Sequence, residues 1–438
     1  MLYKLLKSII GLGLRLYYRE IKITNGVHLQ TKGAKIIIAN HPNTIIDAWV
    51  LTMLCKEPIY YMAKGVFFNT PIRRKLLNSL GLIPVNRASD NKTSGVSNED
   101  SFEMCYRVLE EGKTLVVFPE GTSTQERLLR ELKSGTARIA LQTEVRNKGK
   151  LGLKIIPVGL NYTQAEKFRS SILAKVGEPI TPLAHLELFS TDSTKAAKKL
   201  TSEFKNGLLE LLVDSDSKEQ DLLTDQIVDV LSIQSLKTNQ KGVEKDVALM
   251  KEVYQRLNVI QSTDLNRLEE IKDLTNEISW QLEKLDVKSD FLDRRYRSVM
   301  FIRQAMQSGI GLLVGFPVFV FGLIHNLIPF KIIDKLILKI VKDVEYYAPI
   351  AVLIGLIFYP ITYLSMLYLA GNFFELNFWM NVIYFISMPL SGMFAYYFVQ
   401  YFKHISFKWR FILLMKTRKD VIHELRNERD RLRELIFD

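Results

Sequence analysis

A histidine and an aspartate stand six positions apart, close behind a run of apolar residues. Ile36–Ala39 has the composition of a buried strand, and His41 follows it in the turn before a helix that holds Asp47. Six residues turn about 240° on a helix, so the two side chains cannot share a helix face. His41 must therefore lie before the helix, and the expected N-cap is one of two residues, Asn43 or Thr44.

This arrangement predicts general-base chemistry. Asp47, in the first turns of its helix, can accept a hydrogen bond from the imidazole of His41, fix its tautomer and raise its basicity. The pair is then the base and its orienting carboxylate, and it needs no serine or cysteine nucleophile. A histidine beside an aspartate is equally compatible with a structural contact, so the hypothesis depends on other residues.

Three further segments carry groups suited to an anionic substrate. Lys64 follows a second apolar run, and Arg87 ends the segment Gly-Leu-Ile-Pro-Val-Asn-Arg with a guanidinium suited to bidentate phosphate contact. In Phe-Pro-Glu-Gly-Thr-Ser, Gly121 lets backbone N–H groups approach an anion, and Glu120 can bind a hydroxyl. Each also has a plain structural reading, as a surface charge or an ordinary turn.

In this order, the segments resemble the glycerophosphate and lysophosphatidate acyltransferase superfamily. The resemblance covers roughly residues 30–180 and rests on five segments: His41 to Asp47, Gly81–Arg87, Phe118–Ser123, Ile155–Gly159 and Val176–Ile180. It implies an α/β domain that moves an acyl group from acyl-CoA or acyl carrier protein to an acceptor hydroxyl. It makes His41 the general base and Asp47 its orienting partner, with neither a metal nor an organic cofactor.

The resemblance also implies which residues bind substrate. Lys64 and Arg87 would hold the acceptor phosphate, Glu120 and Gly121 the glycerol end, and backbone donors near Gly121 the oxyanion. The complete implied set is Lys64, Arg87, Glu120, Gly121, Thr122, Ser123, Arg127 and Lys133.

Two features depart from the usual family pattern. Five residues separate His41 from Asp47 where four are usual, and Ser123 replaces the usual arginine. Both features, and the run Leu129–Ala140, are similar to a subgroup that includes the fungal glycerol-3-phosphate/dihydroxyacetone-phosphate acyltransferases. Arg127 and Lys133 are the candidate substitutes for the missing phosphate contact.

The resemblance favours a membrane-bound acyltransferase of phospholipid synthesis that acylates glycerol-3-phosphate or dihydroxyacetone phosphate. The alternative enzyme acylates 1-acylglycerol-3-phosphate or another lysophospholipid. A third hypothesis, from a different class, is a catalytically silent lipid-binding scaffold.

The elements around these residues predict an α/β domain with a mostly parallel sheet. Apolar runs alternate with helical patterns between residue 36 and about residue 180. The expected strands are Ile36–Ala39, Ile59–Ala63, Leu115–Phe118 and Ile155–Leu160, and the expected helices follow Pro42 or cover Pro71–Leu80, Asp100–Glu111 and Ser134–Thr143. Residues 88–99 have the composition of a polar loop.

The rest of the chain is predicted to be helical. Leucine and isoleucine recur at helical spacing in residues 244–288, which favours a helical hairpin or short coiled coil. The predicted parts are an interfacial amphipathic helix 1–25, the acyltransferase domain 26–185, an all-α region 186–303, a membrane region 304–402 and a basic C-terminal helix 403–438.

Three apolar stretches are each long enough to cross about 30 Å of hydrocarbon: Ile310–Phe330, Pro349–Ala370 and Trp379–Phe402. Basic residues flank both ends of the region, which predicts that both ends are cytoplasmic. We therefore expect the first stretch to bend back at Pro317 as a re-entrant or interfacial hairpin. The other two form a spanning hairpin with its outer turn at Gly371–Phe378, and the catalytic domain lies at the cytoplasmic face.

The net charge of +12 is concentrated at the two ends of the chain. Residues 1–35 carry +6 and residues 403–438 carry +4, whereas a nucleic-acid-binding protein spreads its basic residues over a domain. This pattern excludes nucleic acid as a partner and favours membrane lipids, with residues 2–19 as an interfacial helix or, alternatively, a core-packed one. With only two cysteines, Cys55 and Cys105, a disulfide scaffold and a thiolate zinc site are excluded. No oligomeric state is predicted.

Overall fold

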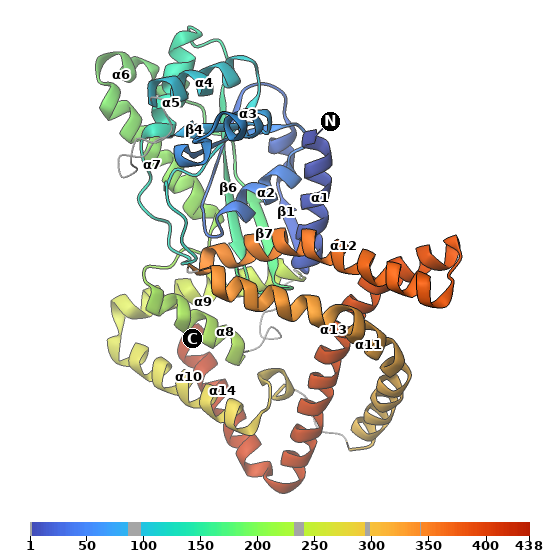
Figure 1. The fold of residues 1–438 in the computed structure, drawn as a ribbon. Helices are drawn as coiled ribbons and strands as arrows, with labels where there is room; N and C mark the ends of the chain where they lie inside the picture. Colours follow the sequence, from blue (N-terminus) through green and yellow to red (C-terminus); the bar gives the residue numbers. More distant parts are fainter. Residues whose placement is uncertain (1, 86–97, 232–240, 294–297, 342) are drawn as a thin grey trace. The chain divides into compact units, whose positions relative to one another are not determined.

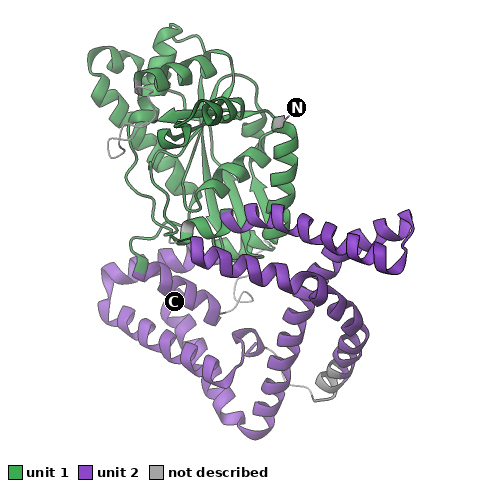
Figure 2. Cartoon of the chain, viewed as in Figure 1, with its two compact units in different colours: residues 1–218, 241–247, 343–349 green, residues 219–240, 248–342, 350–438 purple. Residues whose placement is uncertain are grey.

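The computed structural model describes residues 2–85, 98–231, 241–293, 298–341 and 343–438 (Figure 1). The chain forms two compact units (Figure 2). The first contains residues 1–218, 241–247 and 343–349, and the second contains residues 219–240, 248–342 and 350–438. Each unit is described here by itself.

The first unit is built on a seven-stranded sheet in the order β1-β7-β6-β2-β5-β3-β4. The five strands from β6 to β4 are parallel, β7 is antiparallel to β6, and β1 runs parallel to β7. The mostly parallel sheet predicted from the sequence is confirmed. The strands are β1 (Glu20–Thr24), β2 (Lys35–Ala39), β3 (Ile59–Lys64), β4 (Leu82–Val85), β5 (Thr114–Val117), β6 (Lys154–Tyr162) and β7 (Ser171–Val176).

The predicted helices between the strands are present. They are α2 (Ile45–Leu54), α3 (Pro71–Ser79), α4 (Asn98–Glu110) and α5 (Gly135–Arg146). Most of the predicted polar loop 88–99 lies outside the described residues; its last two positions begin α4.

One face of the sheet carries a core built with three helices. Ile36 and Ile38 of β2 are fully buried in it together with side chains of α4, α5 and α7 (Ser193–Leu211). Because α7 supplies Ala196, Leu200 and Phe204 to this core, the sheet unit extends past the boundary predicted at residue 185. The polar outer face of α7 concealed its membership of the sheet domain in the sequence. A short helix, α6 (Leu186–Thr191), precedes it.

The sequence left two alternatives for the N-terminal helix α1 (Leu2–Tyr17), an interfacial helix or a core-packed one, and the structure shows features of both. Leu14 is fully buried, and α1 contacts α2. Leu5, Ile9, Leu12 and Leu16 are exposed apolar residues at helical spacing, so they form one stripe on the helix surface. One side of α1 therefore packs on the domain, and the other presents an apolar stripe.

The second unit is entirely helical among the described residues. The segment predicted as a hairpin or coiled coil forms two successive helices, α9 (Val243–Thr263) and α10 (Leu265–Leu285), separated at the N-cap Asp264. Helix α10 packs against α14 (Lys419–Phe437), and the Arg267 Nε donates to the Leu435 carbonyl at 2.7 Å. The unit also contains α8 (Lys218–Leu231).

Three helices of this unit are long and apolar enough to cross a membrane: Met306–Ile340 within α11 (Ser298–Ile340), α12 (Tyr347–Phe374) and α13 (Phe378–Thr417). They contain the three predicted stretches. The reversal predicted at Pro317 is wrong, because α11 continues as one helix through this residue and through Pro329. A proline removes only one hydrogen bond from the helix, and its neighbours can maintain the turn. The outer turn was predicted at Gly371–Phe378. In the structure α12 and α13 are separated by a shorter turn, Glu375–Asn377.

Candidate active site

The residues of the candidate site follow the carboxyl ends of parallel strands. His41 comes two residues after β2, and Phe118 directly follows the neighbouring strand β5. Ligand sites of open α/β sheets lie at this edge. The Asn40 side chain extends the β2–β6 pairing, because its Oδ1 accepts from the Leu160 N–H at 2.8 Å and its Nδ2 donates to the Leu160 carbonyl at 3.0 Å. The chain is therefore held in place one residue before His41.

The structure brings His41 and Asp47 together. The His41 Nδ1 lies 2.9 Å from Asp47 Oδ2, and the Asp47 side chain is fully buried. The imidazole stacks on the Phe118 ring with centroids 3.9 Å apart and an interplanar angle of 8°. The His41 side chain is 17% exposed, and no hydrogen bond to its Nε2 occurs among the described residues. The carboxylate fixes the proton on Nδ1, which leaves Nε2 as an accessible base.

Two further groups hold the buried Asp47 carboxylate. The backbone N–H of Asn43 donates to Oδ2 at 2.7 Å, and the Tyr162 hydroxyl donates to Oδ1 at 2.6 Å. Burial raises the pKa of Tyr162 well above its ordinary value, so the hydroxyl keeps its proton and remains a donor. Each carboxylate oxygen therefore has a donor besides the imidazole, and the carboxylate cannot rotate freely.

The turn between His41 and Asp47 is strained. Thr44 has φ 43° and ψ −117°, and the Ile46 N–H donates to the Asn43 carbonyl at 3.0 Å. This is the first central position of a type II′ turn, where glycine is usual. Thr44 is the N-cap of α2, as one of the two alternatives predicted, but its side chain makes no capping hydrogen bond. The turn accommodates the additional residue between His41 and Asp47 at a cost on the order of 1–3 kcal/mol.

Glu120 joins the His41 segment to the loop after β5 through two hydrogen bonds. Its Oε1 accepts from the His41 backbone N–H at 2.9 Å, and its Oε2 accepts from the Arg130 N–H at 3.3 Å. The pKa of Glu120 is raised above its ordinary value, because the effect of burial outweighs the opposing effects of these N–H groups and the neighbouring histidine. With 6% of its surface exposed, Glu120 positions His41 in this structure, whereas the sequence assigned it to the substrate.

Ser123 also contacts the catalytic turn. Its Oγ accepts from the Thr44 N–H at 3.0 Å, and the next residue, Thr124, donates its N–H to the His41 carbonyl at 3.2 Å. Ser123 therefore supports the strained turn at the position where the family usually has an arginine. Thr122 is exposed.

The predicted cations occupy different surroundings. The Lys133 ammonium lies against Gly121, where a Cβ would approach the Nζ to 2.8 Å; at φ 74° the glycine also has a conformation that other residues rarely adopt. The Arg127 guanidinium donates to the Thr163 carbonyl at 3.0 Å. Lys64 ends β3 and is half-buried, with no ion pair among the described residues. Arg87 lies outside the described residues, and so does the end of its motif.

Two positioning residues escaped the sequence analysis. Tyr162 is 115 positions from Asp47, and Tyr18 accepts a hydrogen bond from the Asn43 Nδ2 at 3.0 Å. The only signal in the sequence was that Tyr162 follows the predicted strand Ile155–Leu160 by two residues. No group of three or more His, Cys, Asp or Glu residues suited to a metal ion occurs in the described part of the chain.

Comparisons with known proteins agree with this geometry. Residues 20–161 match the family model described as Acyltransferase. An uncharacterised acyltransferase of Schizosaccharomyces pombe is 33% identical over 110 residues, which are 25% of this chain and 15% of the relative. The 1-acyl-sn-glycerol-3-phosphate acyltransferase of Borreliella burgdorferi is 27% identical over 36% of this chain and 58% of its own length. The glycerol-3-phosphate O-acyltransferase 1 of Saccharomyces cerevisiae is 26% identical over 40% of this chain and 23% of its own length.

Residues 20–161 of the sheet domain therefore match the Acyltransferase family model, and their similarity to these relatives supports the glycerol-phosphate acyltransferase superfamily. The matched region contains the His41–Asp47 pair, the Gly121 turn and the end of β6 up to Asn161. The chain spans between 15% and 58% of the lengths of these relatives.

Proposed function

We propose that this protein is a membrane-bound O-acyltransferase that transfers a fatty acyl group from a thioester to a hydroxyl of a glycerol-phosphate acceptor. The observation that carries the proposal is the imidazole of His41. Its Nδ1 is held by a buried carboxylate, and its Nε2 is accessible and without a hydrogen bond among the described residues. A base fixed in this way can take a proton from a substrate hydroxyl.

The reaction needs one base and no covalent enzyme intermediate. The His41 Nε2 removes the acceptor's hydroxyl proton as the oxygen attacks the thioester carbonyl, and Asp47 stabilises the imidazolium. When the tetrahedral intermediate collapses, the C–S bond breaks and the thiolate takes the proton from Nε2. The products are an ester and a free thiol, and His41 returns to its starting state. The chemistry calls for no cofactor other than the thioester, supplied as acyl-CoA or acyl carrier protein.

Cations beside the site support an acceptor that carries a phosphate. Lys133 lies at the Gly121 turn, next to the residue that binds the His41 backbone, and Lys64 ends a strand at the same edge of the sheet. We assign the phosphate to these lysines together with Arg87, whereas Arg127 is engaged with a backbone carbonyl. Thr122 and the backbone at Gly121 are then left to contact the glycerol end.

The proposed acceptor is glycerol-3-phosphate or dihydroxyacetone phosphate. The spacing of His41 and Asp47 and the presence of Ser123 support it, as does the similarity to a yeast protein named glycerol-3-phosphate O-acyltransferase. The second candidate is 1-acylglycerol-3-phosphate, which the bacterial relative is named for. Both reactions use the same base and differ in the acceptor.

Membrane attachment is supported by the three apolar helices. We propose that the catalytic domain lies at the cytoplasmic face, where the basic ends of the chain meet anionic headgroups. The exposed apolar stripe of α1 would bring the site to the lipid surface.

The test uses the full chain in phosphatidylcholine nanodiscs. Labelled acyl-CoA or acyl carrier protein is supplied with glycerol-3-phosphate, dihydroxyacetone phosphate or lysophosphatidate, and ester formation is measured. We expect ester on one of the first two acceptors and a loss on the order of 10²–10⁴ in rate for His41→Ala. His185→Ala is the matched control, because His185 also pairs with a carboxylate, Glu203, at 2.8 Å.

Each outcome separates the hypotheses. Turnover only with lysophosphatidate would replace the proposed acceptor with the second candidate. Unchanged turnover in His41→Ala would contradict the mechanism. Folded protein without turnover on any donor and acceptor would favour the lipid-binding scaffold.

A further inference from the structure

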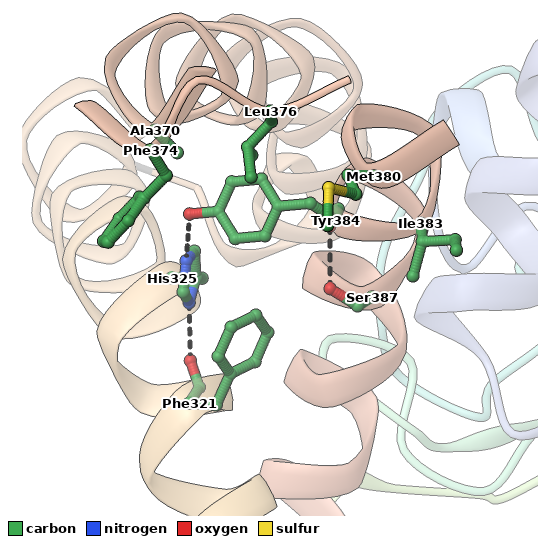
Figure 3. A pocket seen from close by; sticks show the side chains of 9 residues that line it. All are labelled: Phe321, His325, Ala370, Phe374, Leu376, Met380, Ile383, Tyr384 and Ser387. Atoms are coloured by element: carbon green, nitrogen blue, oxygen red, sulfur yellow. Dashed lines mark hydrogen bonds between the residues drawn. The ribbon is translucent and has the colours of Figure 1, made fainter. Parts of the chain in front are cut away.

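The apolar helices of the second unit surround a pocket of about 530 Å³ (Figure 3). Its volume lies in the range of about 300–1,000 Å³ found for small-molecule sites. Three helices contribute its walls: α11 with Phe321 and His325, the end of α12, and the start of α13. The remaining lining residues are Ala370, Phe374, Leu376, Met380, Ile383, Tyr384 and Ser387.

The pocket is accessible from the lipid side of the helices. Phe374 and Ile383 in its wall are each 67% exposed, and Met380 is 52% exposed. Tyr384 lies seven residues beyond the break at Asn377, which is about 10 Å along the helix axis. A helix break leaves backbone groups that need polar partners, so it belongs at the boundary of the hydrocarbon. The Tyr384 and Ser387 oxygens therefore lie roughly 10–15 Å inside this boundary, at the depth of the acyl chains.

A histidine inside a membrane region calls for an explanation, because ionisable side chains are costly there. The Nδ1 of His325 is 2.7 Å from the Phe321 carbonyl, and its Nε2 is 2.7 Å from the Tyr384 hydroxyl. A carbonyl only accepts, so Nδ1 carries the proton. In the neutral ring Nε2 then accepts, and the Tyr384 hydroxyl must donate to it.

The hydroxyl of Ser387, the other polar side chain of the pocket, also donates its proton within the protein. The Ser387 hydroxyl donates to the Tyr384 carbonyl at 2.7 Å. Both hydroxyl protons in the pocket are therefore used within the protein, as Figure 3 shows. The oxygens of Tyr384 and Ser387 keep lone pairs and offer two hydrogen-bond acceptors, whereas the donors of the lining residues are already used and the lining includes no lysine or arginine.

A neighbouring polar cluster has a different character. Asn326 donates to the carbonyls of Gly322 and Met388 at 2.9 and 3.0 Å, and Tyr363 donates to its Oδ1. A Cβ on Gly392 would come within 2.5 Å of the Asn326 side chain, so this contact is closely packed. Its groups satisfy one another between helices, as interhelical hydrogen bonds commonly do. Tyr384, in contrast, borders an open pocket.

We propose that this pocket binds a neutral, single-chain lipid with free hydroxyl groups, of the monoacylglycerol class. Two hydroxyl donors of the glycerol end match the two acceptor oxygens of Tyr384 and Ser387. The acyl chain matches the apolar wall of Phe374, Met380 and Ile383. A carboxylate or phosphate is disfavoured, because it would enter a pocket that offers neither a cation nor a donor. The site is separate from acyl transfer at His41 and does not depend on the proposed function.

The experiment is photo-crosslinking of the full chain in phosphatidylcholine nanodiscs. The probe is a monoacylglycerol with a diazirine in its acyl chain, and the labelled peptides are mapped by mass spectrometry. We expect labels on α12 and α13 around Phe374, Met380 and Ile383. Unlabelled monoacylglycerol should compete about tenfold better than its dimethyl ether, which has the same chain but cannot donate, or than the fatty acid.

Two variants and two controls locate the effect. Ser387→Ala removes one acceptor and should reduce the advantage of monoacylglycerol over the dimethyl ether to less than about threefold, and Ile383→Trp should abolish labelling by filling the pocket. Tyr363→Phe removes a tyrosine hydroxyl from the packed cluster and should leave the advantage intact. His41→Ala should leave labelling intact, which separates this site from the active site.

Equal competition by the ether or the fatty acid would overturn the proposal, because hydroxyl donation would then contribute nothing. Labelling that persists in Ile383→Trp would place the lipid elsewhere and would also overturn it. The same holds if phosphatidylcholine in excess displaces the probe as well as monoacylglycerol does, because the pocket would then accept any chain.

Discussion

Two histidines in different units of this protein are fixed by the same ring nitrogen, with opposite consequences. The Nδ1 of His41 faces a carboxylate and that of His325 faces a backbone carbonyl, and each bond fixes the tautomer. The Nε2 of His41 is left accessible, whereas that of His325 is occupied by a tyrosine hydroxyl. One ring can therefore accept a proton from a substrate, and the other only accepts from its neighbour.

The difference shows that the groups bound to the two ring nitrogens together decide what a histidine does. Asp47 can stabilise an imidazolium, because it supplies the opposite charge at 2.9 Å. The Phe321 carbonyl supplies no charge, and the Tyr384 hydroxyl occupies the Nε2 of His325. The sheet unit therefore has a base, and the helical unit has a fixed pair of acceptors.

The largest effect should come from removing the charge beside His41. We expect Asp47→Asn to lower kcat by about 10²–10⁴, because the amide neither stabilises the imidazolium nor fixes the same tautomer. Glu203→Gln, which neutralises a second histidine–carboxylate pair at the same distance range, is the control. Steady-state acylation rates measure both. Equal losses in the two variants would mean that the effect comes from general destabilisation.

The next effect concerns the phosphate site that we propose in the sheet unit. Lys133→Ala should raise the KM for the glycerol-phosphate acceptor by about 10–100-fold with little change in kcat, because a hydrogen bond from a charged donor contributes about 1.5–3 kcal/mol. Lys150→Ala removes an exposed lysine elsewhere and serves as the control. Crosslinking in the pocket of His325 should not change. A loss confined to kcat would assign Lys133 to the chemical step instead.

Tyr162 should have a smaller effect, which identifies it as a positioning residue. Tyr162→Phe leaves one buried oxygen of Asp47 without its donor, and we expect kcat to fall about tenfold. The KM for the acceptor should stay nearly unchanged, because Tyr162 acts through Asp47 and makes no proposed contact with the substrate. Tyr61→Phe, which removes a hydroxyl bonded to the Ala48 carbonyl, is the matched control. A rise in KM with unchanged kcat would contradict this role.

The smallest effect is on the pH dependence of stability. Burial raises the pKa of Glu120, so the folded protein holds this proton more tightly than the unfolded chain does. Its contribution to the free energy of unfolding therefore decreases as the pH rises from about 4.5 through the raised pKa. Glu120→Gln should make this pH slope shallower in thermal unfolding of the detergent-solubilised chain. An unchanged slope would show that the group titrates as an ordinary carboxyl.

The part of the site that could be predicted lies within one short segment of the sequence, which contains His41 and Asp47. An apolar strand, a turn and the first residues of a helix fix where His41 and Asp47 lie, because fewer than ten positions separate these elements. Lys133 was a candidate through the resemblance alone, and its place beside Gly121 depends on how the loop after β5 folds back. Arg87 stays a prediction, because it lies outside the described residues.

The remainder depended on contacts between distant segments. Tyr162 reaches Asp47 only because β6 pairs with β2, and Glu120 reaches the His41 backbone only because β5 lies on the other side of β2. The amphipathic helix α7 reads as part of a helical region until its apolar face is seen on the sheet. Pro317 illustrates a different error, because the basic residues flanking the membrane region led to a predicted reversal where the helix continues.

The pairing of β1 with β7 has a consequence for the order of events during synthesis. Glu20 pairs with Ser171, so β1 leaves the ribosome roughly 150 residues before its partner exists. At about 5–20 residues per second this interval lasts on the order of 10–30 s. During that time the amphipathic helix α1 is available to a nearby bilayer, while the sheet edge that will receive β1 is still missing. Delivery of the nascent chain to its membrane can therefore precede the closing of the catalytic domain.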